Sequence, residues 1–162
     1  MLKSQVVKIS EISNSQIEEM FNLMQEVYFG VGINKFKKDL SEKDYVLILY
    51  DEKLRGFTTI QVFNFRGKKI IYSGDTVISA ASRGEIELMR AWWRFSYKIQ
   101  QENPGQDVYW LLISKGWRTY KFFPLFLKEF CPNKSAKTPP DVQEFIDALG
   151  AEKFGKNYKD GI

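Results

Sequence analysis

Residues 45–79 read YVLILYDEKLRGFTTIQVFNFRGKKIIYSGDTVIS, and this stretch decides the fold class. Its first six residues, 45–50, are continuously apolar, which is typical of a central strand that is buried on both faces. A polar turn leads to a second strand predicted over 56–65, and another polar turn leads to a third strand predicted over 70–79. Three consecutive strands joined by tight turns predict an antiparallel meander.

The segment before the meander combines a strand with two helices. Residues 5–9 are predicted as a short first strand, and a short charged helix is predicted over 34–43. Between them, Ser15 and Glu18 have the spacing of a capping box, so we expect a longer helix to begin at Ser15. Its apolar residues recur at helical spacing and predict one buried face.

The segment after the meander alternates helix and strand. Ser82 and Glu85 form a second capping-box pattern, which predicts a helix running to about residue 101. Three further elements are predicted: a strand over 108–114, an aromatic helix over 118–130 and a last helix over 141–149. Pro124 predicts either a kink in the aromatic helix or a start delayed to about that position.

Composition bounds the class of protein. At 162 residues, with 44% hydrophobic and 27% charged residues, the chain is expected to form a single α/β domain over residues 1–162. No apolar stretch reaches the roughly 18 residues that a membrane span needs, and Cys131 is the only cysteine. We therefore expect a cytoplasmic protein without membrane contact, disulfide or metal.

The absence of histidine restricts the chemistry. With no His in the chain, Ser-His-Asp and Cys-His catalysis are excluded, and proton transfer must use carboxylates, Tyr, Lys, water or the backbone. The net charge of +4 is unevenly distributed, because residues 108–140 carry six Lys and Arg against Glu129 alone. A basic segment suits an anionic ligand such as a nucleotide phosphate, and a solvated helix face would carry the same charges.

The order of elements resembles that of the GNAT acyltransferase superfamily over about residues 5–130. In that family three meander strands are followed by a helix, a strand and a helix. The resemblance implies a mixed, mostly antiparallel central sheet flanked by helices. The family completes its sheet with two more strands, which this chain does not have room for, so we expect a shortened or interrupted member that lacks them.

The resemblance also implies where the acyl-CoA substrate binds. The family carries a Gln/Arg-x-x-Gly-x-Gly/Ala loop between its fourth strand and third helix, where backbone N–H groups hold the pyrophosphate. Residues 81–86 match it in position, with Gly84 retained and Ala81 and Ile86 departing from the pattern. The cofactor-binding residues implied by the resemblance lie on the loop and on the strand before it: Val77, Ile78, Ser79, Ser82, Arg83, Gly84 and Glu85. An ordinary capping box would also account for the residues from Ser82 to Glu85.

Two residues are candidates for proton transfer. Asp75 is a carboxylate within an otherwise apolar strand, which is costly unless the group is paired or used. The resemblance implies that Asp75 is the general base, and a turn or bulge residue is the alternative. Tyr120 lies near the position where many family members place the Tyr that protonates the departing thiolate; the alternative is one core aromatic among many.

The resulting hypothesis is transfer of an acyl group from acetyl-CoA, another acyl-CoA or a carrier-bound pantetheine to a small-molecule or peptide amine. The alternative is a non-catalytic ligand-binding or protein-interaction domain on the same fold. Nucleic-acid binding through residues 115–137 is disfavoured by the small overall charge and the lack of a recognition motif. Without a sixth strand, the edge of strand 108–114 is expected either to be covered by residues 150–162 or to support self-association or partner binding.

Overall fold

The computed structural model of the protein describes residues 2–113 and 120–159. The chain forms two compact units, Met1–Ile113 and Ser114–Ile162. The expectation of one domain over residues 1–162 remains a prediction. None of the helices in the described ranges has the length and apolar character that crossing a bilayer requires.

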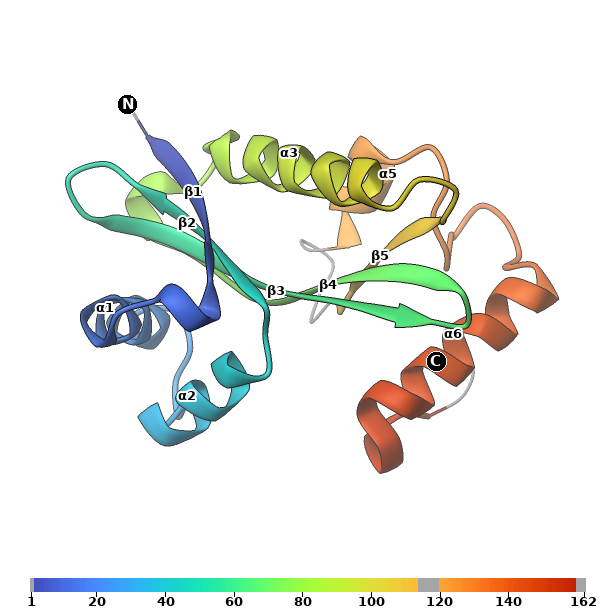
Figure 1. Ribbon diagram of the computed structural model, residues 1–162, viewed down its shortest axis with the longest axis horizontal. Coiled ribbons are helices and arrows are strands. Elements are labelled where there is room, and N and C mark those ends of the chain that lie inside the picture. The colour runs from blue at the N-terminus through green and yellow to red at the C-terminus, as the bar shows by residue number, and fades with distance from the viewer. Residues whose placement is uncertain (1, 114–119, 160–162) are drawn as a thin grey trace. The chain divides into compact units, whose positions relative to one another are not determined.

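The first unit is built on a five-stranded mixed sheet whose strand order follows the chain (Figure 1). Its strands are β1 (Lys3–Lys8), β2 (Tyr45–Tyr50), β3 (Leu54–Phe65), β4 (Lys68–Ile78) and β5 (Val108–Leu112). The pairs from β1 to β4 are antiparallel, and β4 pairs with β5 in parallel. The predicted meander and the mixed, mostly antiparallel sheet are confirmed.

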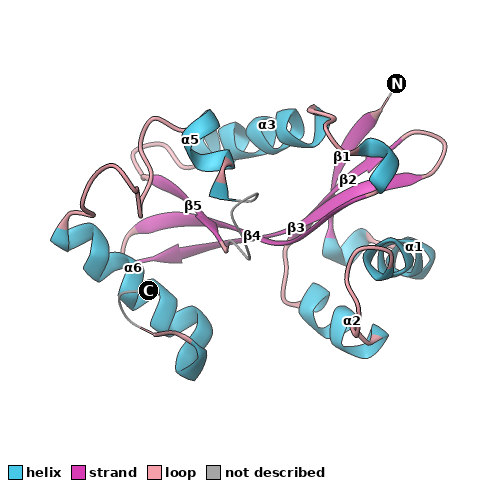
Figure 2. Cartoon of the chain, turned by 180° about the vertical axis from the view of Figure 1, so that it is seen from behind, coloured by secondary structure: helices cyan, strands magenta, loops and turns pink. Residues whose placement is uncertain are grey.

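Helices cover both faces of this sheet (Figure 2). Helices α1 (Asn14–Gln25) and α2 (Ile33–Ser41) lie on one face, and α3 (Glu87–Glu102) lies on the other. The apolar run of β2 supplies both cores, because Val46 and Ile48 pack toward α1 and α2 while Leu47 and Leu49 pack toward α3. Alternating side chains along a strand produce this division, as the continuous apolar run predicted.

The first capping box lies two residues earlier than predicted. Ser13, not Ser15, is the N-cap of α1, and its hydroxyl accepts a hydrogen bond from the Gln16 amide at 3.2 Å. The Gln16 side chain in turn accepts from the Ser13 amide at 2.9 Å. Two overlapping Ser-x-x-Gln/Glu patterns compete here, and the helix begins at Asn14, which places Ser15 inside its first turn.

The second predicted capping box, Ser82 with Glu85, is wrong. Helix α3 begins at Glu87 with Ile86 as its N-cap, and no side chain caps it. Ser82 is instead the buried last residue of a 3₁₀ turn, η2 (Ala80–Ser82). Gly84 has φ +93°, a left-handed conformation that cannot lie in the first turn of an α-helix, so the helix cannot start before it.

The second unit contains α5 (Phe122–Phe126), α6 (Pro140–Phe154) and a final 3₁₀ helix, η3 (Gly155–Asn157). Helix α5 is much shorter than the aromatic helix predicted over 118–130, part of which lies outside the described residues. Helix α6 extends five residues beyond the predicted 141–149. Glycine is needed at position 150 within this helix because the Tyr158 ring packs there, and a Cβ atom would lie 2.2 Å from the ring.

Strand β5 is the last strand of the sheet. Within residues 2–113 and 120–159, no strand pairs with its outer edge, and an isolated bridge between Asn133 and Ala136 is the only later β pairing. The expected absence of two further strands therefore holds for the described part of the chain. Self-association through the β5 edge remains a prediction.

Candidate functional site

A β-bulge interrupts β4 at Gly74 and Asp75. The β3–β4 register pairs Thr58 with Thr76 and Ile60 with Ser73, so Gly74 and Asp75 together lie opposite the single residue Thr59. Such a two-against-one arrangement bends the strand and redirects its side chains. Asp75 is thus the bulge residue that the sequence offered as one alternative, and its catalytic role remains untested.

The pairing of β5 with β4 ends at the same point. The parallel pairing runs from Lys69 with Val108 to Ser73 with Leu112 and then ends. Residues 74–78 of β4 continue beyond it, and no strand in the described part of the chain pairs with them on that side. The described pairing of β4 with β5 therefore ends at the residue before the bulge.

The bulge carries a compact group of side chains on the sheet face that holds α1 and α2. We call Lys43, Thr59, Tyr72, Gly74 and Asp75 the bulge cluster. A Cβ atom on Gly74 would lie 2.5 Å from the Thr59 hydroxyl oxygen and 3.0 Å from Lys43 Cε. Glycine is therefore required for this close approach.

Lys43, Tyr72 and Thr59 contribute polar groups to the bulge cluster. The Lys43 ammonium donates to the Asp39 carbonyl oxygen at 3.0 Å and lies 5.8 Å from the centre of the Tyr72 ring. Burial raises the pKa of the Tyr72 phenol, and the negative charges of Asp75 and Asp39 raise it further. The Thr59 hydroxyl is buried and has no hydrogen-bond partner in the described structure.

The loop that follows β4 leads to the start of α3. Within it, the amides of Ser82 and Glu85 donate to the carbonyl oxygens of Ser79 and Ser82 at 3.0 and 3.3 Å. The Arg83 amide donates to Ala80 at 3.5 Å. These three amides are therefore used inside the loop, which the sequence pattern did not reveal.

Other donors of this loop remain unused. Across the described residues, the amides of Gly84, Glu87 and Leu88 have no backbone acceptor, and the first main-chain bond of α3 runs from Arg90 to Ile86. The Ser79 hydroxyl is buried without a partner. Unused amides at a helix start attract anions, and this donor set is chemically suited to a phosphate group.

Two acidic side chains lie near these amides. The Glu87 carboxylate accepts from the Ser4 hydroxyl at 2.7 Å and from Arg94 Nη2 at 2.6 Å, and these two contacts lower its pKa. The Glu87 carboxylate is therefore bound by Ser4 of β1 and by Arg94 of its own helix. Glu85 is exposed and brings a negative charge to the loop.

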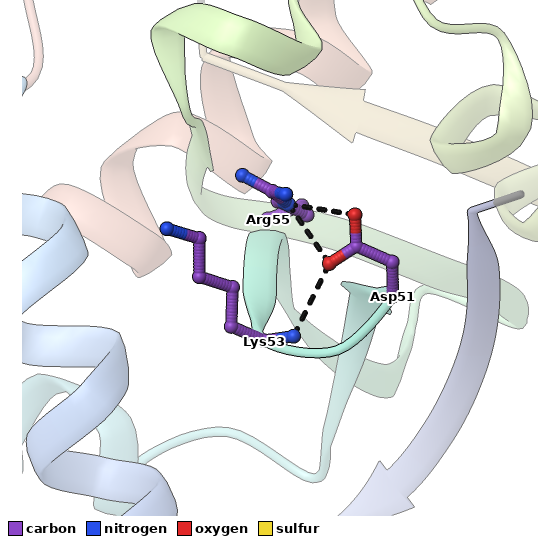
Figure 3. Close-up of polar contacts among 3 residues, drawn as sticks. All are labelled: Asp51, Lys53 and Arg55. Atoms are coloured by element: carbon purple, nitrogen blue, oxygen red, sulfur yellow. Dashed lines mark hydrogen bonds and ion pairs between the residues drawn. The ribbon is translucent and has the colours of Figure 1, made fainter.

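Arg55 is a basic residue beside this loop that the sequence reasoning missed. Its carbonyl oxygen accepts a hydrogen bond from the Ser79 amide at 2.8 Å, which places Arg55 next to the first residue of the loop. Its Nε lies 2.9 Å from each oxygen of the Asp51 carboxylate, which also accepts from the Lys53 amide at 3.1 Å (Figure 3). Its Nη groups have no acceptor in the described part of the chain.

The Asp51–Arg55 pair fixes the position of the guanidinium. The hydrogen bond from Arg55 lowers the pKa of the Asp51 carboxyl to about 2, with a further contribution from the Lys53 amide. A charged Asp51 therefore holds Nε at neutral pH. The spacing of Asp51 and Arg55 across a turn was the only sequence signal for this pair.

Tyr120 belongs to the second unit. Its hydroxyl donates to the Pro132 carbonyl oxygen at 3.2 Å, and its ring packs edge-on against Phe123 and Phe130 at 6.1 and 6.2 Å between ring centres. These contacts are those of an aromatic cluster, the alternative given above. Its role as a general acid remains a prediction.

Comparison with known proteins identifies the fold. No family model and no curated protein matches the chain. An aminoglycoside acetyltransferase from an uncultured soil metagenomic sample, in complex with sisomicin, superposes with a TM-score of 0.58 at 15% identity, covering 85% of this chain and 94% of that one. A ribosomal-protein-alanine N-acetyltransferase from Brucella melitensis biovar Abortus 2308 gives a TM-score of 0.60 at 8% identity, covering 86% and 99%.

A third similar structure contains a ligand. It is a predicted acetyltransferase with acetyl-CoA from Clostridium acetobutylicum, with a TM-score of 0.55 at 10% identity, covering 82% of this chain and 94% of that one. The TM-scores of these three structures establish the architecture, and their low sequence identities leave the substrate open. The chain has the fold of the GNAT acyltransferase superfamily, as its order of elements predicted.

Proposed function

We propose that the protein is an N-acyltransferase that transfers an acyl group from acyl-CoA to an amine. The observation that carries this proposal is that the described β4–β5 pairing ends at Ser73, directly before the Gly74–Asp75 bulge with its carboxylate, and that β4 then leads to a loop with unused amides. A thioester bound there would have donors on one side and a proton acceptor on the other.

The loop would hold the phosphates of acyl-CoA. The amides of Gly84, Glu87 and Leu88 would donate to the pyrophosphate, with Ser82, Arg83 and Glu85 shaping the loop around it. Arg55 would add the guanidinium that Ala81 cannot supply, because its Nη groups are unused beside Ser79. Val77, Ile78 and Ser79 would line the pantetheine path through their backbone groups.

The bound donor supplies the thioester, and the chain supplies positioning and proton transfer. Backbone N–H groups of β4 beyond Ser73 would polarise the thioester carbonyl. Asp75 would remove a proton from the incoming amine. Tyr120 stays the residue that the resemblance implies for protonating the departing thiolate. No covalent enzyme intermediate is needed, so a chain without histidine is sufficient.

The acceptor is proposed to be a small-molecule or peptide amine. The names of the similar structures include both kinds, an aminoglycoside acetyltransferase and a ribosomal-protein-alanine acetyltransferase. Acidic groups at the bulge support a cationic acceptor, since Asp75 and Asp39 both act on Tyr72. We also propose a cytoplasmic location, from the composition alone.

A binding domain without catalysis is the second candidate. Glu85 on the loop and Glu87 at the first helical position of α3 favour it, because both place negative charge near the proposed phosphate site. Ala81 and Ile86 also depart from the family pattern. In this alternative the unused amides would bind another ligand or none.

Equilibrium binding separates the two candidates. Titration of the full chain with acetyl-CoA, a long-chain acyl-CoA and CoA should give saturable binding, and release of free CoA thiol in the presence of an amine panel should reveal turnover. Binding without thiol release from any amine would support the binding domain. A chain that binds none of the three ligands contradicts the proposed function.

A further inference from the structure

The bulge cluster contains an amine of its own. Lys43 follows the end of α2, and its half-buried side chain packs directly onto Gly74, with Cε 3.0 Å from the position of a Cβ atom there. One further bond leads from Cε to Nζ, so the amine lies at most about 4.5 Å from that position. Lys43 therefore brings a primary amine to the bulge itself.

The surroundings of this amine orient it without pairing it with a carboxylate. Nζ uses one hydrogen bond, to the Asp39 carbonyl oxygen at 3.0 Å, and faces the Tyr72 ring at 5.8 Å. No carboxylate lies within ion-pair distance of Nζ in the described residues, although Asp75 is in the same cluster. A carbonyl oxygen at a helix end and an aromatic face both stabilise a cation. They leave two of its three N–H groups unused.

The position coincides with the place where the proposed reaction needs its acceptor. A thioester carbonyl held by β4 beyond Ser73 would lie beside Gly74, within reach of Lys43 and with Asp75 nearby as proton acceptor. Holding two reactants side by side can accelerate their reaction by many orders of magnitude. The two acidic residues that act on Tyr72, Asp39 and Asp75, repel neither the amine nor its ammonium form.

We propose that Lys43 is an intramolecular acyl acceptor, so that the chain acylates itself at this residue. The inference rests on the proposed function, because acyl-CoA is the donor. The Lys43 ammonium first passes a proton to Asp75 or water. The neutral Nζ then attacks the thioester carbonyl carbon, an N–C bond forms and the C–S bond breaks. The second proton that the nitrogen loses passes, directly or through water, to the departing CoA thiolate. The products are an Nε-acyl-lysine and free CoA.

Self-acylation would also change the site. An acylated Lys43 loses its positive charge and fills the space beside Gly74, so the bulge would be closed to external amines. The chain would thereby carry a mark that reports exposure to acyl-CoA.

Mass spectrometry of the full chain tests the inference. After incubation with acetyl-CoA, peptide mapping should show acetylation of Lys43 at a rate at least about tenfold above that of Lys37 and Lys38. Lys37 and Lys38 lie exposed on α2, shortly before Lys43 in the chain. They therefore report uncatalysed acetylation, which favours exposed amines. Lys43→Arg should abolish the signal while keeping the stem and the charge, and Lys38→Arg should leave it unchanged. Asp75→Asn should slow acetylation of Lys43 and leave that of Lys37 unchanged.

The outcomes separate this inference from the proposed function. If the chain binds acetyl-CoA but Lys43 stays unmodified, or reacts no faster than Lys37 and Lys38, self-acylation is overturned and the proposed function stands. If equilibrium titration detects no acetyl-CoA binding, the proposed function fails and self-acylation fails with it.

Discussion

Two glycines at the ends of one short segment are required for different physical reasons. At Gly74, in the bulge, any side chain would clash with Thr59, since a Cβ atom would lie 2.5 Å from the Thr59 hydroxyl oxygen. Gly84, in the loop before α3, has nothing within 4 Å of a Cβ atom but adopts φ +93°. The bulge therefore depends on packing, and the loop depends on backbone conformation.

The comparison separates the two halves of the proposed site. The bulge is half-buried and brings together residues from α2's end, β3 and β4, so changes there should affect chemistry and stability together. The loop is open and fixed by its own hydrogen bonds, so changes there should affect ligand binding with little effect on the core. Variants in each half can test this division.

The largest effect is expected at the bulge carboxylate. Asp75→Asn should lower turnover by about 10²–10⁴, the usual cost of removing a general base, while acyl-CoA affinity stays within a few-fold. Steady-state rates of thiol release with an identified amine provide the measurement. Asp39→Asn is the matched control, because it removes another negative charge that acts on Tyr72. Full activity of Asp75→Asn would show that transfer proceeds without this carboxylate.

A smaller effect is expected from filling the space at Gly74. Gly74→Ala should destabilise the fold by about 1–3 kcal/mol, because the added methyl group overlaps the Thr59 side chain. Urea unfolding gives the free energy, and Thr59→Ala in the same chain should recover part of the loss in a double-mutant cycle. If the two changes lower the free energy of unfolding additively, the contact between residues 59 and 74 does not explain why glycine is needed at position 74.

The loop variant should differ from its control in affinity for acyl-CoA and not in stability. Gly84→Asp should weaken acyl-CoA binding by about tenfold or more, since a carboxylate would repel the pyrophosphate beside the unused amides. Gly105→Asp is the matched control, because Gly105 also has positive φ (+79°) and open space around it. Both variants share a strain of about 1–2 kcal/mol. Equal affinities of the two variants for acetyl-CoA, measured by calorimetry, would show that the loop is not part of the binding site.

The smallest effect concerns the turn that fixes Arg55. In Arg55→Gln the Asp51 pKa should rise from about 2 toward its ordinary value of 3.8, as followed by NMR titration of the carboxyl group. Because the folded pKa is the lower one, the stabilisation from this pair is present above pH 3.8 and is lost as the pH falls toward 2. Lys53→Gln is the control, since Lys53 contributes its backbone amide. An Asp51 pKa that stays near 2 in Arg55→Gln would show that the turn amides suffice.

The sequence determined the architecture of the first unit because its signals are local. The apolar run 45–50, the polar turns of the meander and the periodicity of the first helix each depend on neighbouring residues, and all appear in the structure with small shifts at their ends. Helix starts were predicted less well, because Ser-x-x-Glu patterns occur more often than capping boxes. The sequence could not show that Gly84 adopts positive φ, and this conformation moved the start of α3 to Glu87.

Only the tertiary structure decided the composition of the candidate site. Lys43 meets Gly74, and Arg55 meets Ser79, across more than twenty residues of chain, and neither contact has a local signature. The bulge itself follows from a register shift between β3 and β4, which is a property of the pair and not of either strand. The sequence named Asp75 through its charge within an apolar strand, and Gly84 through the resemblance of its loop to that of the family. Their partners emerged only when strand pairing and helix packing had brought distant side chains together.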